Sequence, residues 1–98
     1  MSSSEPRILC VENDPMLGET RCSVLVNSGY DAVTATLQEA RSMLRSQAFD
    51  LIILSATLSD EEKARITTAA GNKARLLQLS LMTEPPVLLT DVAQRLFD

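Results

Sequence analysis

The side chains that could do chemistry follow apolar stretches of the chain. Glu12, Asn13 and Asp14 come after the first such stretch, Ser55 after the third, and Ser80 near the end of the fourth. Glu12 and Asp14 could hold a divalent cation weakly, or they could form a solvated turn and a helix cap. Ser55 could be a nucleophile only beside a base; otherwise it caps the local backbone or is the target of a separate kinase. Ser80 could contact a ligand or simply end a strand.

Several kinds of site are excluded by residues that the chain lacks. There is no His, the commonest general base, metal ligand and partner of a Ser or Cys nucleophile. The two cysteines, Cys10 and Cys22, have neither the CxxC spacing of a redox or zinc site nor the density of a secreted disulfide framework. With three glycines, a nucleotide-binding loop is hard to build. We therefore expect no enzyme, no metal site and no cofactor.

The strands and helices that must position these residues have visible limits. Asp14 followed by Pro15 indicates a helix start, and Gly29 indicates a helix end. Thr36, with Glu39 at the third helical position, forms a capping box. The expected strands are Arg7–Val11, Tyr30–Ala35, Asp50–Ser55 and Arg75–Leu81. Four helices are expected between and after them. The first runs from Pro15 to about Asn27, the second begins after Thr36, the third runs from Ser59 or Asp60 to about Ala70, and the last covers Val87–Phe97.

Strands that alternate with helices predict an α/β fold, with a parallel sheet covered by helices on both faces. The first strand is almost continuously apolar, as strands buried on both faces are. In an open parallel sheet, functional sites form at the carboxyl ends of the strands. Glu12, Ser55 and Ser80 are the residues that we expect at this edge of the sheet.

Length and composition predict one small acidic domain. The chain has 98 residues, of which 9 are Lys or Arg and 13 are Asp or Glu, so its formal net charge is −4. We assign residues 7–98 to the domain and residues 1–6 to a disordered tail. Because proteins that bind nucleic-acid phosphates are usually basic, we expect no nucleic-acid partner. The start lacks an apolar signal region and no apolar block is long enough to span a bilayer, so we expect a cytoplasmic protein without membrane contact.

Three stretches of the sequence carry a resemblance to a known family. They are Arg-Ile-Leu-Cys-Val-Glu-Asn-Asp-Pro at 7–15, Ser-Gly-Tyr-Asp-Ala-Val at 28–33 and Phe-Asp-Leu-Ile-Ile-Leu-Ser at 49–55. Together they resemble the receiver domain of bacterial two-component response regulators. The resemblance runs from about Arg7 to Ser59, and resumes weakly at Leu76–Ser80 and Pro85–Leu96. It implies a flavodoxin-like (CheY-like) fold and a role in phosphorelay signal transduction.

The resemblance also implies a mechanism from which this sequence departs. Such receivers accept a phosphoryl group from a histidine kinase onto an Asp after the third strand, where this chain has Ser55. Their acidic pair, which holds Mg²⁺, corresponds to Glu12 and Asn13, so one carboxylate is an amide here. Their Lys aligns best with Glu84, which reverses the charge, and Ser80 alone matches the family pattern. The phosphorylation site therefore reads as degenerate.

The chain is also shorter than the family pattern by about one βα unit. Too few residues separate Ser80 from Pro85 for a crossover helix and a further strand, which together need roughly a dozen residues or more. We therefore expect four strands, with the fourth at the edge of the sheet. An apolar edge can pair with another chain, unless the segment Leu81–Leu89 folds back over it. The residues of this edge that could form an interface are Leu76, Leu77, Leu79 and Leu81.

The sequence is compatible with two functions. The first is a pseudo-receiver that is not phosphorylated and binds a histidine kinase or another regulator, or pairs with itself through the fourth strand. The alternative is an active phosphorelay receiver that uses unusual acidic residues together with Mg²⁺.

Overall fold

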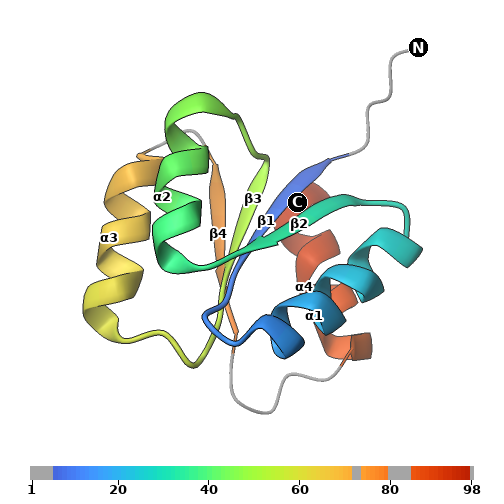
Figure 1. Ribbon diagram of the computed structural model, residues 1–98. Helices are drawn as coiled ribbons and strands as arrows, with labels where there is room; N and C mark the ends of the chain where they lie inside the picture. The colour runs from blue at the N-terminus through green and yellow to red at the C-terminus, as the bar shows by residue number, and fades with distance from the viewer. Residues whose placement is uncertain (1–5, 72–73, 80–84, 98) are drawn as a thin grey trace.

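Strands and helices alternate along the chain as the hydrophobic pattern predicts (Figure 1). The computed structural model describes residues 6–71, 74–79 and 85–97. The strands are β1 (Arg7–Val11), β2 (Asp31–Ala35), β3 (Leu51–Leu54) and β4 (Arg75–Gln78); the helices are α1 (Pro15–Asn27), α2 (Leu37–Ser46), α3 (Asp60–Ala70) and α4 (Pro85–Phe97). Within these residues, no helix has the length and apolar character needed to cross a membrane.

The four strands form one parallel sheet in the order β2-β1-β3-β4. In its register, Val11 lies beside Ala35 on one side and beside Leu54 on the other, and Leu54 lies beside Gln78. The carboxyl ends of all four strands are therefore level. Side chains that follow these strands meet along one edge of the sheet, as predicted.

Helices cover both faces of the sheet, with α1 and α4 on one face and α2 and α3 on the other (Figure 1). The side chains of β1 alternate between these faces: Ile8 and Cys10 pack toward α1 and α4, whereas Leu9 and Val11 pack toward α2 and α3. All four are buried. The continuous apolar run in the sequence thus reflects burial on two faces rather than one.

Local capping signals set the ends of the helices. Asp14 caps α1, and Thr36 forms the predicted capping box with Glu39 at the start of α2. Of the two candidates for the third helix, Ser59 is the cap, and it forms a second capping box with Glu62. Gly29 follows the end of α1 with a φ of 97°, a conformation that favours glycine.

Five element limits differ from the sequence prediction. β3 covers Leu51–Leu54 rather than Asp50–Ser55, so it is one residue shorter at each end. β2 begins at Asp31 rather than Tyr30. The Tyr30 N–H donates to the Leu25 carbonyl near the end of α1, so it is not available to the sheet. β4 ends at Gln78, and α4 begins at Pro85 rather than Val87. Prolines are tolerated in the first turn of a helix, where the backbone N–H groups have no partner within the helix. The expected strand residues 80 and 81 lie outside the described part of the chain.

Candidate functional site

Glu12 and Ser55 meet at the carboxyl edge of the sheet. Glu12 follows β1 and Ser55 follows β3, and these two strands are neighbours. The Ser55 hydroxyl donates a hydrogen bond to Glu12 Oε1 over 2.5 Å. Both residues are buried: Glu12 is 2% exposed and Ser55 is 0% exposed. The prediction that Glu12 belongs to a solvated turn is therefore wrong, because the turn carries its side chain into the edge of the core.

Arg21 of α1 supplies a positive charge to this site. Its Nη1 donates to Glu12 Oε1 over 2.7 Å and to the Ser55 hydroxyl over 3.1 Å. The side chains of this ion pair are 17% and 1% exposed for Arg21 and Glu12. Removing two charges from water is unfavourable unless they pair and their remaining hydrogen-bonding positions are filled. The guanidinium thus serves as the counter-charge of the buried carboxylate.

Thr57 completes the hydrogen bonding of the site. Its hydroxyl donates to Glu12 Oε2 over 2.7 Å, and its backbone N–H donates to the Ser55 hydroxyl over 3.2 Å. The backbone N–H of Asp14 also donates to Glu12 Oε2, over 3.1 Å. Each oxygen of the Glu12 carboxylate therefore accepts two hydrogen bonds. Among the described residues, no buried side-chain nitrogen or oxygen lacks a hydrogen-bond partner. We call Glu12, Arg21, Ser55 and Thr57 the buried polar network.

The buried polar network favours the ionised form of Glu12. Burial by itself would raise the pKa of this carboxyl group, but the hydrogen bonds from Ser55, Thr57 and the Asp14 backbone outweigh burial. The charge of Arg21 acts in the same direction, and the pKa of Glu12 lies below its ordinary value. The sequence offered no His as a base beside Ser55, but the structure places the Glu12 carboxylate there. Because its pKa is lowered, that carboxylate is a weak base.

The donor set that the described residues supply at this edge does not fit a magnesium ion. Mg²⁺ in proteins is held mainly by carboxylate oxygens and water in an octahedral arrangement. Here the one buried carboxylate already accepts four hydrogen bonds, and the Arg21 guanidinium lies directly against it. Among residues 6–71, 74–79 and 85–97, no group of three or more His, Cys, Asp or Glu residues could hold a metal ion.

The side chains of Asn13 and Asp14 make structural contacts outside the buried polar network. The Asn13 amide donates to Glu62 over 3.0 Å, and its carbonyl oxygen accepts from the Leu37 N–H over 3.2 Å. Asn13 therefore links the turn after β1 to the first turns of α2 and α3. The Asp14 carboxylate is exposed and accepts from the Met16 N–H over 3.0 Å, as expected of a helix cap.

The remaining sequence candidates divide into two groups. Ser80, Leu81 and Glu84 lie outside the described part of the chain. In β4 and just after it, Leu77 and Leu79 are buried against the α1 and α4 face. Leu76 is half-buried and packs on the opposite face. Two of the four residues proposed as an edge interface therefore direct their side chains into the core.

Arg21 and Thr57 are the site residues that the sequence prediction missed. The available signal for Arg21 was its position within the apolar stripe of α1, between Leu17 and Val24, where a charge needs a partner. Thr57 had a weaker signal, since it lies two residues after Ser55 in a loop. Neither signal indicates that these side chains contact Glu12 and Ser55.

A cavity of about 230 Å³ adjoins the buried polar network. Arg21 and Thr57 belong both to the network and to the lining of this cavity. Its other lining residues come from α1, α4 and the loop after β3: Leu17, Thr20, Val24, Ala56, Pro85 and Leu88. Arg21 and Thr57 thus face a mainly apolar cavity beside α1, whereas Glu12 and Ser55 are not among its lining residues.

Solved structures share the fold of this chain, although no family model and no curated protein matches the sequence. The non-phosphorylated HemR receiver domain from Leptospira biflexa aligns with a TM-score of 0.76 at 23% identity, covering 96% of each chain. A CheY-like response regulator receiver domain protein from Methanospirillum hungatei JF-1 aligns with a TM-score of 0.68 at 20% identity, covering 95% of this chain and 94% of that one.

A third structure agrees with these two. The signal receiver domain of a protein assigned as a Luxo repressor from Vibrio parahaemolyticus aligns with a TM-score of 0.64 at 18% identity, covering 94% of this chain and 90% of that one. The chain therefore has the fold of a response regulator receiver domain, the CheY-like form of the flavodoxin-like α/β fold. The fold that the resemblance implied is confirmed.

Proposed function

We propose that this chain is a receiver-type signalling module that acts by binding a protein partner, without phosphorylation and without catalysing a reaction. The main support for this proposal is the buried polar network. Ser55 occupies the place after β3 where such receivers carry their acceptor Asp. It is 0% exposed, and its hydroxyl is bound to Glu12, Arg21 and Thr57.

The chemistry of the network argues against phosphoryl transfer to Ser55. A serine nucleophile needs a base that takes its proton and a path to the phosphodonor. Glu12 is a weak base because its pKa is lowered, and the Ser55 hydroxyl has no exposed surface. Arg21 supplies the positive charge that a cation would otherwise bring. We therefore propose that the site uses no cofactor and holds no magnesium ion.

The proposed partner is a histidine kinase or another regulator, as the resemblance implies. The net charge of −4 favours a protein surface over nucleic-acid phosphates. Three proteins with this fold are receiver domains by name, which supports a role in two-component signalling. The proposed location, the cytoplasm of a bacterial cell, follows from the sequence resemblance alone. Binding that does not depend on phosphorylation would let the module hold a partner at all times, rather than only after a signal.

Intact-mass measurement tests the absence of phosphorylation. The purified chain is incubated with Mg²⁺ and acetyl phosphate, next to a receiver that carries the acceptor Asp as a positive control. We expect the control to gain the mass of one phosphoryl group and this chain to gain none. A stoichiometric gain of that mass by this chain, at any residue, would overturn the proposal. An acid-stable, base-labile adduct would indicate phosphoserine, whereas an acyl phosphate on Asp or Glu is labile in both acid and base.

The alternative, a phosphorelay receiver with unusual acidic residues, is favoured by one observation. Asp14 is an exposed carboxylate at the carboxyl edge of the sheet. The same mass measurement on Asp14→Asn and Glu12→Gln separates the two functions. An adduct that forms on the unsubstituted chain and disappears in Asp14→Asn would establish the alternative.

Partner binding is tested separately. We expect a histidine kinase from the same cell to bind this chain with the same affinity, within twofold, whether or not acetyl phosphate and Mg²⁺ are present. Ser55→Ala serves as the matched variant, and it should bind equally well. A kinase affinity that changes tenfold on addition of the phosphodonor would contradict phosphorylation-independent binding.

A further inference from the structure

Among the described strands, β4 is the outermost, and some of its backbone groups are directed away from the sheet. The Arg75 N–H donates to the Asp50 carbonyl over 3.2 Å, and the Leu79 N–H donates to the Leu54 carbonyl over 2.9 Å. In a parallel ladder, both backbone groups of a residue point to the same side, and alternate residues point to opposite sides. Arg75, Leu77 and Leu79 therefore face β3. Leu76 and Gln78 direct their N–H and carbonyl groups to the outer side.

A groove runs along this outer side, between β4 and α4. One cavity of about 370 Å³ is lined by Arg75, Leu76, Gln94 and Arg95. A second, of about 410 Å³, is lined by Leu77, Gln78, Asp91, Gln94 and Arg95. The two share Gln94 and Arg95, so they form a continuous depression along the strand. We call it the β4 groove.

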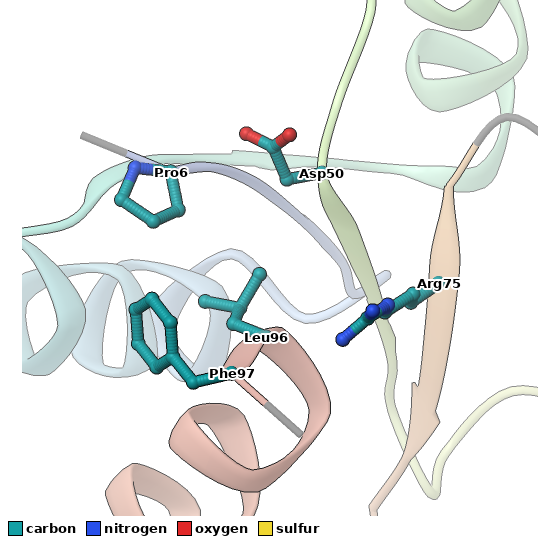
Figure 2. Close-up of a pocket in the computed structure, with 5 residues that line it drawn as sticks. All are labelled: Pro6, Asp50, Arg75, Leu96 and Phe97. Atoms are coloured by element: carbon teal, nitrogen blue, oxygen red, sulfur yellow. The ribbon is translucent and has the colours of Figure 1, made fainter. Parts of the chain in front are cut away.

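Arg75 lines one end of the groove, but its guanidinium is bound to α4 of the same chain. Charged side chains on edge strands commonly block pairing with other chains. Here, however, the Arg75 guanidinium donates to the backbone carbonyl of Arg95 near the end of α4, where a helix carries partial negative charge. Figure 2 shows Arg75 pointing from β4 toward Leu96 and Phe97, into a cavity of about 280 Å³. The charge is thus directed onto the α1 and α4 face.

We propose that the β4 groove receives the β4 strand of a second copy of this chain, in antiparallel orientation about a two-fold axis, forming one continuous sheet. Of the β4 residues, only Leu76 and Gln78 face outward. In an antiparallel pair, two opposite residues both face the partner strand or both face away from it. A two-fold axis can therefore pass through Leu76, Leu77 or Gln78, but not between two residues. The axis at Leu77 sets Leu76 of each copy opposite Gln78 of the other. That register makes four backbone hydrogen bonds and places Arg75 opposite Leu79, with no like charges in contact.

Charges on α4 favour a second copy over an unrelated strand. Asp91 and Arg95 lie one helical turn apart and both line the β4 groove beside Leu77. A two-fold axis at Leu77 reverses the direction of the second α4 relative to the first. Asp91 of one copy then faces Arg95 of the other, twice. The surface is self-complementary, as a two-fold interface requires. This inference does not depend on whether the chain is phosphorylated.

Sedimentation equilibrium over a range of concentrations provides the first test. We expect twice the monomer mass at high concentration and a shift toward monomer on dilution. Gln78→Pro removes an outward N–H and leaves the β3 ladder intact, so it should abolish the dimer, whereas Gln78→Ala should retain it. Circular dichroism confirms that both variants fold. A monomer at every concentration, or a dimer that Gln78→Pro does not weaken, would overturn the proposal.

Disulfide trapping identifies the register. In a Cys22→Ser background, Leu76→Cys and Gln78→Cys chains are oxidised separately and as a mixture. The proposed register brings residue 76 of one copy beside residue 78 of the other, so only the mixture should cross-link efficiently. Efficient cross-linking of Leu76→Cys alone or of Gln78→Cys alone would indicate one of the other two registers and contradict the proposed one.

Charge exchange tests the contribution of α4. Asp91→Arg and Arg95→Asp should each weaken self-association at least tenfold, because each places like charges across the interface. An equimolar mixture of the two variants should associate again as a heterodimer, since each new charge then faces an opposite one. Failure of the mixture to associate, when the unsubstituted chain does, would exclude the proposed arrangement of the helices.

Discussion

The guanidinium of Arg21 lies 2.7 Å from the carboxylate of Glu12, in the place where the receiver resemblance implies a divalent cation. The ion pair joins the middle of α1 to the turn after β1. Ser55 and Thr57, which follow β3, complete its hydrogen bonds. The site thus carries its own counter-charge, and several consequences of that relationship can be measured.

Loss of Arg21 should leave a buried carboxylate without its partner. We expect Arg21→Ala to lower the free energy of unfolding by about 3 kcal/mol, the usual effect of removing one member of a buried ion pair. The double variant Arg21→Ala/Glu12→Gln should be more stable than Arg21→Ala, because it no longer buries an unpaired charge. Urea denaturation at pH 7 measures both.

The control for this comparison is Arg41→Ala. Arg41 is exposed on α2, and its loss should change the free energy of unfolding by no more than about 0.5 kcal/mol. An Arg21→Ala protein as stable as the Arg41→Ala protein would show that the ion pair contributes little.

Stability should fall in acid through Glu12. The pKa of Glu12 is below its ordinary value of 4.5 in the folded chain, since hydrogen bonds and Arg21 outweigh the opposing effect of burial. The folded state therefore binds fewer protons than the unfolded state in this range. The stabilisation is fully present above about pH 4.5 and is lost as the pH falls through the lowered pKa.

Denaturation curves of the unsubstituted chain and Glu12→Gln, taken from pH 7 to pH 3, isolate this contribution. The difference in unfolding free energy between the two proteins should shrink below about pH 4.5. The pKa of Glu62 is also lowered, by the Ser59 backbone N–H and the Asn13 amide, but Glu62 is present in both proteins and cancels. A difference that is constant with pH would contradict the lowered pKa of Glu12.

Gly18 permits the close approach of α1 to β2. A Cβ atom at this position would overlap the hydroxyl of Thr34. We expect Gly18→Ala to lower the free energy of unfolding by about 1 kcal/mol, because overpacking outweighs the better helix propensity of alanine. In a Thr34→Ala background the overlap with the hydroxyl is removed and the closest contact is the Cβ of residue 34 at 3.3 Å, so the same substitution should cost much less. Thermal unfolding of the four proteins measures the coupling, and full additivity would rule out the contact.

The two cysteines should differ in reactivity. Burial raises the pKa of the Cys10 thiol to about 12, and the nearby Cys22 thiol acts in the same direction. Cys22 is half-buried, and its thiol contacts the Ala32 carbonyl over 3.1 Å. Because the thiolate is the reactive form, we expect iodoacetamide at pH 8 to modify Cys22 slowly and Cys10 only after unfolding.

Peptide mass mapping of the modified protein distinguishes the two sites. Cys22→Ser should leave a folded protein without a reactive thiol, and urea should expose Cys10 in the same variant. Equal rates of modification at Cys10 and Cys22 in the folded chain would show that β1 opens far more readily than its burial indicates.

The order of the elements could be read from the sequence because its signals are local. Asp14, Thr36 and Gly29 act on backbone groups within a few residues of themselves, so the caps of α1 and α2 and the end of α1 follow from residue type and spacing. The continuous apolar run of β1 predicts burial on two faces. The parallel sheet then brings Glu12 and Ser55 to one edge. Each of these features depends on a short segment or on a general rule of α/β folds.

Only the tertiary structure decided what these residues contact there. Arg21 reaches Glu12 because α1 packs on the sheet with one particular rotation about its axis, and that rotation results from the packing of Leu25 and Gly18 rather than from any local signal. Asn13 turns to α2 and α3 because their first turns carry Glu62 and the Leu37 N–H. The sequence by itself thus determined the elements, the fold class and the meeting of Glu12 with Ser55. The partner of a buried charge depends on helix packing, a property of the whole chain.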